Sequence, residues 1–110
     1  MARSIQENVY SEELVARVRA LGQRIRTARI RRKFRQADLA EKSRLSKSTI
    51  EKIEAGELTT SLGAYAQVLW VLQLDRELDL VADPGLDRDG LAFSVEHKRV
   101  MPKRQVNNDF

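Results

Sequence analysis

Apolar residues between positions 11 and 82 recur at three- and four-residue spacing, which is typical of short amphipathic helices. The first predicted helix begins after Ser11, a good N-cap, and continues to Phe34. Glu12 and Glu13 place negative charge in its first turn, where it meets the positive helix end. Gly22 lies within this helix and allows either a close contact between helices or a kink. The apolar stripe consists of Leu14, Val18, Leu21, Ile25 and Ala28.

The segment from Gln36 to Gly56 predicts two shorter helices. The first covers residues 36–42, and residues 43–45 form a tight turn. Ser46 is then the N-cap of the second helix, which ends at Gly56 because glycine takes a left-handed conformation without steric cost. Two short helices joined by a three- or four-residue turn make a helix-turn-helix. An ordinary helical hairpin inside a bundle has the same spacing and remains an alternative.

The next predicted helix runs from Leu62 to Gln73 after Ser61 as its N-cap, and it is apolar on more than one face. If Leu62, Ala66, Leu69 and Leu72 face the core, Val68 and Trp70 are left as surplus apolar surface. Such surface usually covers a partner, here a fifth helix or another subunit.

Residues 75–82 predict a fifth helix capped by Asp75, but their alternating pattern also fits an edge strand. Residues 86–110 have too little apolar content for a core of their own. We expect them to be an extended tail that orders on a partner, or else a frayed chain end. The predicted fold is therefore all-α: a compact five-helix bundle with a mostly extended C-terminal tail. Residues 1–10 would be a flexible arm, 11–83 the helix-turn-helix domain and 84–110 the tail.

The charge is unevenly distributed along the chain, whose net charge is +4. The segment from Arg17 to Lys52 holds thirteen basic and three acidic residues, a net +10, and the other residues carry a net −6. A concentrated basic segment is the electrostatic footprint of a polyanionic partner. A solvated arginine-rich helix would look similar, but here the basic segment coincides with the helix-turn-helix.

Other features argue against an enzyme and against a membrane protein. The chain has no cysteine and one histidine, and it lacks metal-ligand clusters, glycine-rich phosphate loops and nucleophile–base sets. We therefore expect no catalytic residue, no metal and no cofactor. No apolar run approaches the length of a membrane span, and the N-terminus lacks the apolar core of a signal peptide. We expect a cytoplasmic, nucleoid-associated bacterial protein.

The order R-x-x-[RK]-x-x-x-Q-x-x-L-A-x-x-x-x-x-S-x-x-T-I-x-x-I-E-x-G, from Arg29 to Gly56, resembles the phage repressor and Cro type of helix-turn-helix, the XRE family. The resemblance implies a compact bundle of helices and an ion pair between Arg29 and Glu54. It also implies that Gln36 contacts a DNA phosphate and supports the recognition helix. It places Lys47, Ser48 and Lys52 where base edges are read.

The chemistry of these residues agrees with the resemblance. Lysine suits guanine O6 and N7 in the major groove, and serine accepts several bases. Gln36 at a helix N-terminus would bring its amide and the helix dipole to a phosphate. The family usually has a capping residue where this chain has Arg35, and glycine where it has Arg44. Arg44 must therefore take a left-handed conformation. The phosphate-contact candidates are Gln36, Arg35, Thr49, Thr59 and Ser61.

The stretches T-S-L-G-A-Y-A-Q-V-L-W-V-L-Q-L-D and L-V-A-D-P-G-L-D-R-D-G-L-A-F resemble HipB-like antitoxins, small regulators encoded beside HipA-type kinase toxins. That resemblance implies a homodimer that binds an inverted-repeat operator in double-stranded DNA and also holds the toxin. The alternatives are a stand-alone phage-type repressor and a protein-interaction module with secondary DNA binding. The expected dimer or partner surface consists of Val68, Trp70, Leu78 and Leu80.

Overall fold

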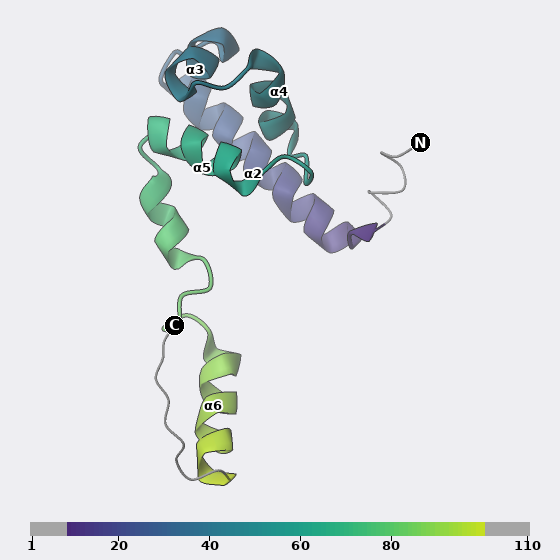
Figure 1. The fold of residues 1–110 in the computed structure, drawn as a ribbon, viewed down its shortest axis with the longest axis vertical. Helices are drawn as coiled ribbons and strands as arrows, with labels where there is room; N and C mark the ends of the chain where they lie inside the picture. The colour runs from purple at the N-terminus through teal and green to yellow at the C-terminus, as the bar shows by residue number, and fades with distance from the viewer. Residues whose placement is uncertain (1–8, 101–110) are drawn as a thin grey trace. The chain divides into compact units, whose positions relative to one another are not determined.

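The computed structural model of the protein describes residues 9–100, with side chains as far as residue 96. Its elements, in chain order, are α2 (Glu12–Arg31), α3 (Gln36–Ser43), α4 (Lys47–Ala55), α5 (Leu62–Val71), the 3₁₀ helix η1 (Asp75–Leu80) and α6 (Arg88–Val100) (Figure 1). No strand occurs among the described residues. The all-α prediction is therefore confirmed, and residues 75–80 form a 3₁₀ helix where an α-helix or a strand was expected. Most of the predicted N-terminal arm, residues 1–10, lies outside the described residues.

Three serine N-caps begin the helices where the sequence predicts them. Each side-chain oxygen accepts a hydrogen bond from the backbone N–H three residues later, at 3.0 Å for Ser11 and Ser46 and 3.1 Å for Ser61. These bonds satisfy N–H groups that have no partner within the helix. The starts of α2, α4 and α5 are thus determined by residues adjacent in the sequence.

Three helices end at a non-glycine residue in the left-handed conformation: Lys33 (φ 60°), Arg44 (φ 60°) and Gln73 (φ 64°). The N–H of the following residue then bonds to a carbonyl five residues earlier, as Leu45 does to Ala40 at 3.0 Å. This is the Schellman pattern, in which the following residue often makes an apolar contact. Those following residues all pack against the core: Phe34, Leu45 and Leu74. The conformation expected for Arg44 is therefore present, whereas α2 ends at Arg31 and not at Phe34.

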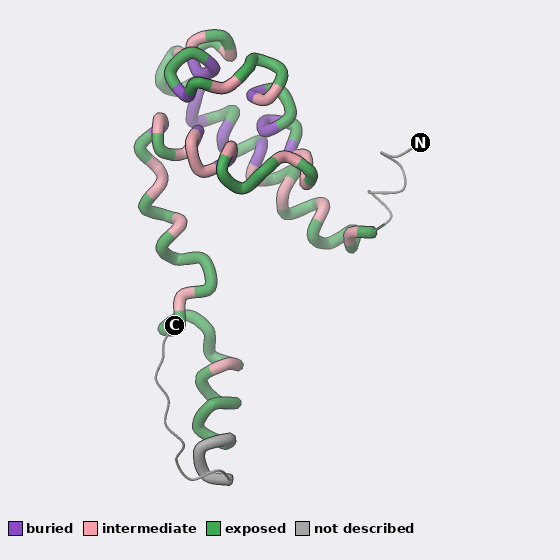
Figure 2. The backbone as a smooth tube through the Cα atoms, in the orientation of Figure 1, coloured by how far each residue is buried: buried purple, intermediate pink, exposed green. Residues whose placement is uncertain are grey.

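The core lies in the first of two units into which the chain divides, ending at Asp75 (Figure 2). Helices α2, α3, α4 and α5 each contribute to it. Its large, fully buried apolar side chains are Ile25, Leu39, Ile50, Ile53, Val68 and Leu72. Of the four α5 residues predicted to face the core, Leu72 is fully buried and Leu62 is strongly exposed.

The placement of Val68 on a partner surface is wrong, because its side chain is 0% exposed, whereas that of Leu62 is 75% exposed. Tyr65, Val68 and Leu72 form the buried face of α5, at three- and four-residue spacing. The hydroxyl of Tyr65 donates a hydrogen bond to the carbonyl of Glu57 at 2.8 Å. Helix α5 has no charged residue and is apolar on more than one face, so its sequence leaves the buried face open; the hydrogen bond of Tyr65 lies on the face that is buried.

Gly22 makes a close contact between helices. A Cβ built there would lie 2.6 Å from the carbonyl oxygen of Glu54 and 2.7 Å from that of Ile53. Gly56 lies equally close to α2, since its Cβ would be 2.5 Å from the Cα of Arg19. The two glycines let the backbones of α2 and α4 touch, and this contact sets the position of α4.

The second unit begins at Arg76 and contains α6. The prediction of a mostly extended tail is wrong for residues 88–100, which are helical. Asp87 caps this helix, because its side chain accepts a hydrogen bond from the N–H of Gly90 at 3.0 Å. Capping and local propensity form the helix even though no side chain from residue 76 to residue 96 is buried. No described helix is long and apolar enough to cross a membrane.

Candidate nucleic-acid interface

Helix α4 has one buried and one exposed face. Ile50 and Ile53 are fully buried in the core. The three residues expected to read bases, Lys47, Ser48 and Lys52, are all exposed. Ser48 and Lys52 are four residues apart and share a face of α4, and the exposed Glu51 is a helical neighbour of Lys47 in the same way. All four lie away from the two buried isoleucines. The helix therefore exposes a mainly polar face, and a B-DNA major groove is wide enough to admit one helix.

The beginning of α4 is held by two hydroxyl groups. The Oγ of Ser46 accepts from the backbone N–H of Thr49, and the two side-chain oxygens lie 2.9 Å apart. Only one hydroxyl hydrogen is needed between them. The other hydroxyl hydrogen, on Ser46 or on Thr49, remains able to donate to a phosphate. Thr49, the predicted phosphate contact, is half-buried.

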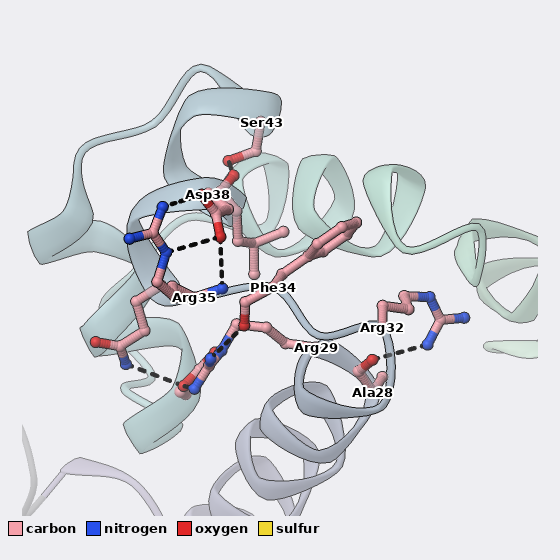
Figure 3. A network of polar contacts seen from close by, with 10 residues as sticks. Ala28, Arg29, Arg32, Phe34, Arg35, Asp38 and Ser43 are labelled. Carbon is pink, nitrogen blue, oxygen red and sulfur yellow. Dashed lines mark hydrogen bonds and ion pairs between the residues drawn. The ribbon is translucent and has the colours of Figure 1, made fainter.

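The buried carboxylate of Glu54, near the end of α4, is bonded to Arg29 near the end of α2. The Nη2 of Arg29 donates to one oxygen of Glu54 at 3.1 Å, and its Nε donates to the other. The Nη1 of Arg29 donates to the carbonyl of Phe34 at 2.8 Å (Figure 3). Side-chain exposure is 10% for Arg29 and 4% for Glu54, so this is a buried bidentate pair. It connects the end of α2 to the end of α4.

Gln36 joins the same network. Its Nε2 donates to an oxygen of Glu54 at 3.0 Å, while its side chain is half-buried. An amide carries two N–H groups and one oxygen, so Gln36 keeps a second donor for a phosphate. The first residue of α3 is therefore bonded to α4 and still has the N–H group that its expected phosphate contact requires.

Arg35 precedes α3 without capping it through its own side chain. Instead, the carboxylate of Asp38 accepts from the Arg35 backbone N–H at 2.8 Å, from its Nε at 3.1 Å and from its Nη2 at 3.1 Å. The side-chain hydrogen bond from Arg35 lowers the pKa of Asp38 below its usual value. Asp38 is not among the site residues predicted from the sequence. An acidic residue three positions after an N-cap is the signal that would have found it.

The loop before α5 carries the two remaining phosphate candidates. Thr59 and Ser61 are both exposed. The oxygen of Ser61 accepts the cap hydrogen bond from Ala64, but its O–H hydrogen is still available to a phosphate oxygen.

The basic side chains around the helix-turn-helix are almost all exposed. Arg29 is the exception and is neutralised by Glu54. Lys42 lies over the ring of Phe34, with its Nζ 5.0 Å from the ring centre. The exposed basic residues from residue 17 to residue 52 are Arg17, Arg19, Arg24, Arg26, Arg31, Arg32, Lys33, Arg35, Lys42, Arg44, Lys47 and Lys52. These basic side chains outnumber the two exposed acids of the same range, Glu41 and Glu51, and such an excess of positive charge attracts a polyanion.

A family model described as a helix-turn-helix domain matches residues 20–81, more than half of the chain. The chain belongs to the helix-turn-helix domain family. The match agrees with the broad XRE-type resemblance and indicates a DNA-binding regulator. Comparisons with curated proteins and with solved structures found no match.

The residues expected to form a partner surface are only partly accessible. Trp70 and Leu80 are each 59% exposed, Leu78 is half-buried, and Val68 belongs to the core. No group of three or more histidine, cysteine, aspartate or glutamate residues suited to a metal ion occurs in the described part of the chain. The described features that bear on function are therefore a polar helix face, a basic surface and exposed apolar side chains.

Proposed function

We propose that this protein is a sequence-specific DNA-binding transcriptional regulator that reads base edges with Lys47, Ser48 and Lys52. The observation that carries the proposal is the exposed polar face of α4, opposite its buried Ile50 and Ile53. Residues near the start of a recognition helix point toward bases in the major groove. Gln36, Arg35, Thr49, Thr59 and Ser61 hold the backbone phosphates on either side.

The regulator acts as a homodimer on an inverted repeat. The segment from Ser61 to Leu74 contains no charged residue, although Leu62 and Trp70 on α5 are strongly exposed. An uncharged helix with exposed large apolar side chains favours burial against another protein surface. Two copies would place their α4 helices in successive major grooves, about 34 Å apart.

The biological role we propose is that of an autoregulatory antitoxin of a HipA-type kinase toxin system. Its support is the second unit, where Leu91 and Val95 on α6 are exposed at 62% and 47%. These residues are four apart and share a face of the helix. A short helix of this kind is marginally stable alone and gains from a protein partner.

Two other functions fit the same features. A stand-alone phage-type repressor would use α4 in the same way and need no protein partner. A protein-interaction module would use α5 or α6 as its main surface and bind DNA only secondarily. The exposed Leu91 and Val95 favour a protein partner over the stand-alone repressor.

A selection from random duplexes at physiological salt tests the DNA-binding proposal. The purified chain is compared with Lys47→Ala/Lys52→Ala, and Arg76→Ala/Arg88→Ala serves as a control that loses the same charge outside the helix-turn-helix. We expect the wild type and the control to enrich one inverted repeat and the α4 variant to lose it. If the α4 variant selects the same sequence as the wild type, α4 is not the reading helix.

Co-purification tests the antitoxin role. The full-length chain is co-expressed with the protein encoded by a neighbouring kinase-like gene, and Leu91→Ser/Val95→Ser is the variant. We expect the wild type to retain the kinase and the variant to lose it, with DNA binding unchanged. If the wild type and the variant both retain the kinase, α6 is excluded as the contact. If neither retains it, the stand-alone repressor is favoured.

A further inference from the structure

We infer that Asp38 is a positioning residue that holds the Arg35 guanidinium in place for a DNA phosphate at the start of α3. The inference rests on the proposed function, because the phosphate belongs to the DNA that α4 reads. It concerns a pair in which Arg35 occupies a position where a small capping residue is the usual choice.

Three hydrogen bonds join Arg35 to Asp38. One carboxylate oxygen of Asp38 accepts from both the backbone N–H and the Nε of Arg35, at 2.8 Å and 3.1 Å. The other oxygen accepts from Nη2 at 3.1 Å. Three bonds from one residue to one carboxylate hold the arginine side chain close to its own backbone (Figure 3). Arginine loses less conformational freedom on binding a ligand when its side chain is already ordered.

The same geometry determines which edge of the guanidinium is available. Its Nε–Nη2 edge is bound to the carboxylate, so the Nη1–Nη2 edge faces away from Asp38. This second edge has the parallel N–H groups that match two oxygens of a phosphate. The side chain of Arg35 is 83% exposed and that of Asp38 only 30%, so the cation is the outer member of the pair.

Neighbouring contacts support the same role. Gln36, the next residue, is held by Glu54 in a comparable way, at 3.0 Å. The start of α3 therefore presents two consecutive donor side chains, each held by a carboxylate. An acidic residue near DNA repels phosphates. Asp38 instead accepts three hydrogen bonds from Arg35, which accounts for an acid at this position.

The alternative is that Asp38 neutralises Arg35 and weakens DNA binding. The two readings predict opposite effects of Asp38→Asn. If Asp38 only repels DNA, the substitution tightens binding, as removal of any nearby acid does. If Asp38 positions Arg35, the substitution also weakens the contact between Arg35 and the phosphate, and binding does not tighten as it does in the control. Glu41→Gln is the matched control, because Glu41 is an exposed acid on the same helix.

The experiment measures binding of a labelled mixed-sequence duplex by the full-length chain over a series of salt concentrations. Phosphate contacts are independent of sequence, so no operator is needed. The variants are Arg35→Gln, Asp38→Asn, their double variant, Glu41→Gln, and Arg35→Gln/Glu41→Gln. Melting curves accompany each variant, and asparagine keeps an oxygen that can accept the backbone N–H of Arg35.

We expect Arg35→Gln to reduce the slope of log affinity against log salt by about 1. The ratio of wild-type affinity to Arg35→Gln affinity should then fall about threefold when the salt concentration rises fourfold. Asp38→Asn should bind more weakly than Glu41→Gln and have a reduced slope. In the Arg35→Gln background, Asp38→Asn and Glu41→Gln should change the affinity by the same amount, because no arginine is left at position 35 for Asp38 to position.

Two results would overturn the inference while the proposed function stands. One is a wild-type slope in Arg35→Gln, which means that Arg35 contacts no phosphate. The other is Asp38→Asn tightening binding as much as Glu41→Gln in both backgrounds, which means that Asp38 only repels DNA. Failure of the wild type to bind the duplex at any salt concentration would overturn the proposed function and the inference with it.

Discussion

Arg29 and Glu54 are 25 residues apart in the sequence, yet they form a bidentate ion pair with both side chains buried. A buried pair contributes less to stability than its bonds suggest, because both charges lose their hydration. Its loss on one side alone is costly, since the remaining charge is left buried. The pair joins the end of α2 to the end of α4, and we expect removal of one partner to lower the free energy of unfolding far more than removal of both.

Glu54→Ala should lower the free energy of unfolding by about 3–5 kcal/mol, because Arg29 then stays buried without a counter-charge. The measurement is urea denaturation followed by circular dichroism. Arg29→Met/Glu54→Leu is the control, which removes both charges and should cost much less. Equal losses in the two variants would contradict this account of the pair.

Gly22→Ala should lower the free energy of unfolding by about 1–3 kcal/mol, because the added Cβ overlaps backbone atoms that no side-chain rotation can move away. Those atoms are the carbonyl oxygens of Ile53 and Glu54, at 2.7 Å and 2.6 Å. Thermal melts measure the effect.

Gly63→Ala is the matched control, since its Cβ would have only the Ser61 Oγ near it, at 3.9 Å. It should raise stability by about 0.5–1 kcal/mol, as alanine does over glycine within a helix. If Gly22→Ala also stabilises the protein, the contact between α2 and α4 is looser than the structure indicates.

Gln73→Gly should raise the free energy of unfolding by about 1 kcal/mol, because Gln73 pays for a left-handed conformation that glycine takes freely. Its φ is 64°. Gln23→Gly is the control, since Gln23 is an exposed glutamine within α2. There the same substitution should lower stability by about 0.5–1 kcal/mol. Changes of the same sign at both sites would contradict the prediction.

Acid should weaken the start of α3 through Asp38. Hydrogen bonds from Arg35 hold the pKa of Asp38 below its usual value in the folded protein. The stabilisation is present above the ordinary carboxyl pKa and is lost as the pH falls through the lowered one. Melting temperatures of wild type and Asp38→Asn should therefore converge as the pH falls. A constant difference down to the lowest pH would show that the carboxylate contributes nothing through its charge.

Trp70→Ser should weaken self-association without unfolding the chain, because Trp70 is 59% exposed. Sedimentation equilibrium measures the shift toward monomer. Trp70 is the only tryptophan, so its fluorescence maximum in the wild type should move to shorter wavelength as dimers form. Val68→Ser is the contrasting variant and should unfold the domain, since Val68 is fully buried. A monomeric wild type would contradict the proposed dimer.

Much of the candidate site follows from interactions within four residues along the chain. Ser46 caps α4 and Gly56 ends it by hydrogen bonds to adjacent backbone groups. The spacing of Ile50 and Ile53 then determines which face is buried, and Lys47, Ser48 and Lys52 must be exposed. Local geometry is therefore sufficient to predict the helix-turn-helix and its polar face.

Other features depended on elements that meet only in the folded chain. Nothing local distinguishes Val68 from Leu62 on a helix that is apolar on more than one face, so the packing of α3 and α4 against α5 decided which of the two is buried. The sequence left Gly22 as either a close contact or a kink, and it is a close contact because the carbonyl oxygens at the end of α4 lie against it. Helix periodicity specifies which residues share a face, but the neighbouring surfaces determine which face loses its water.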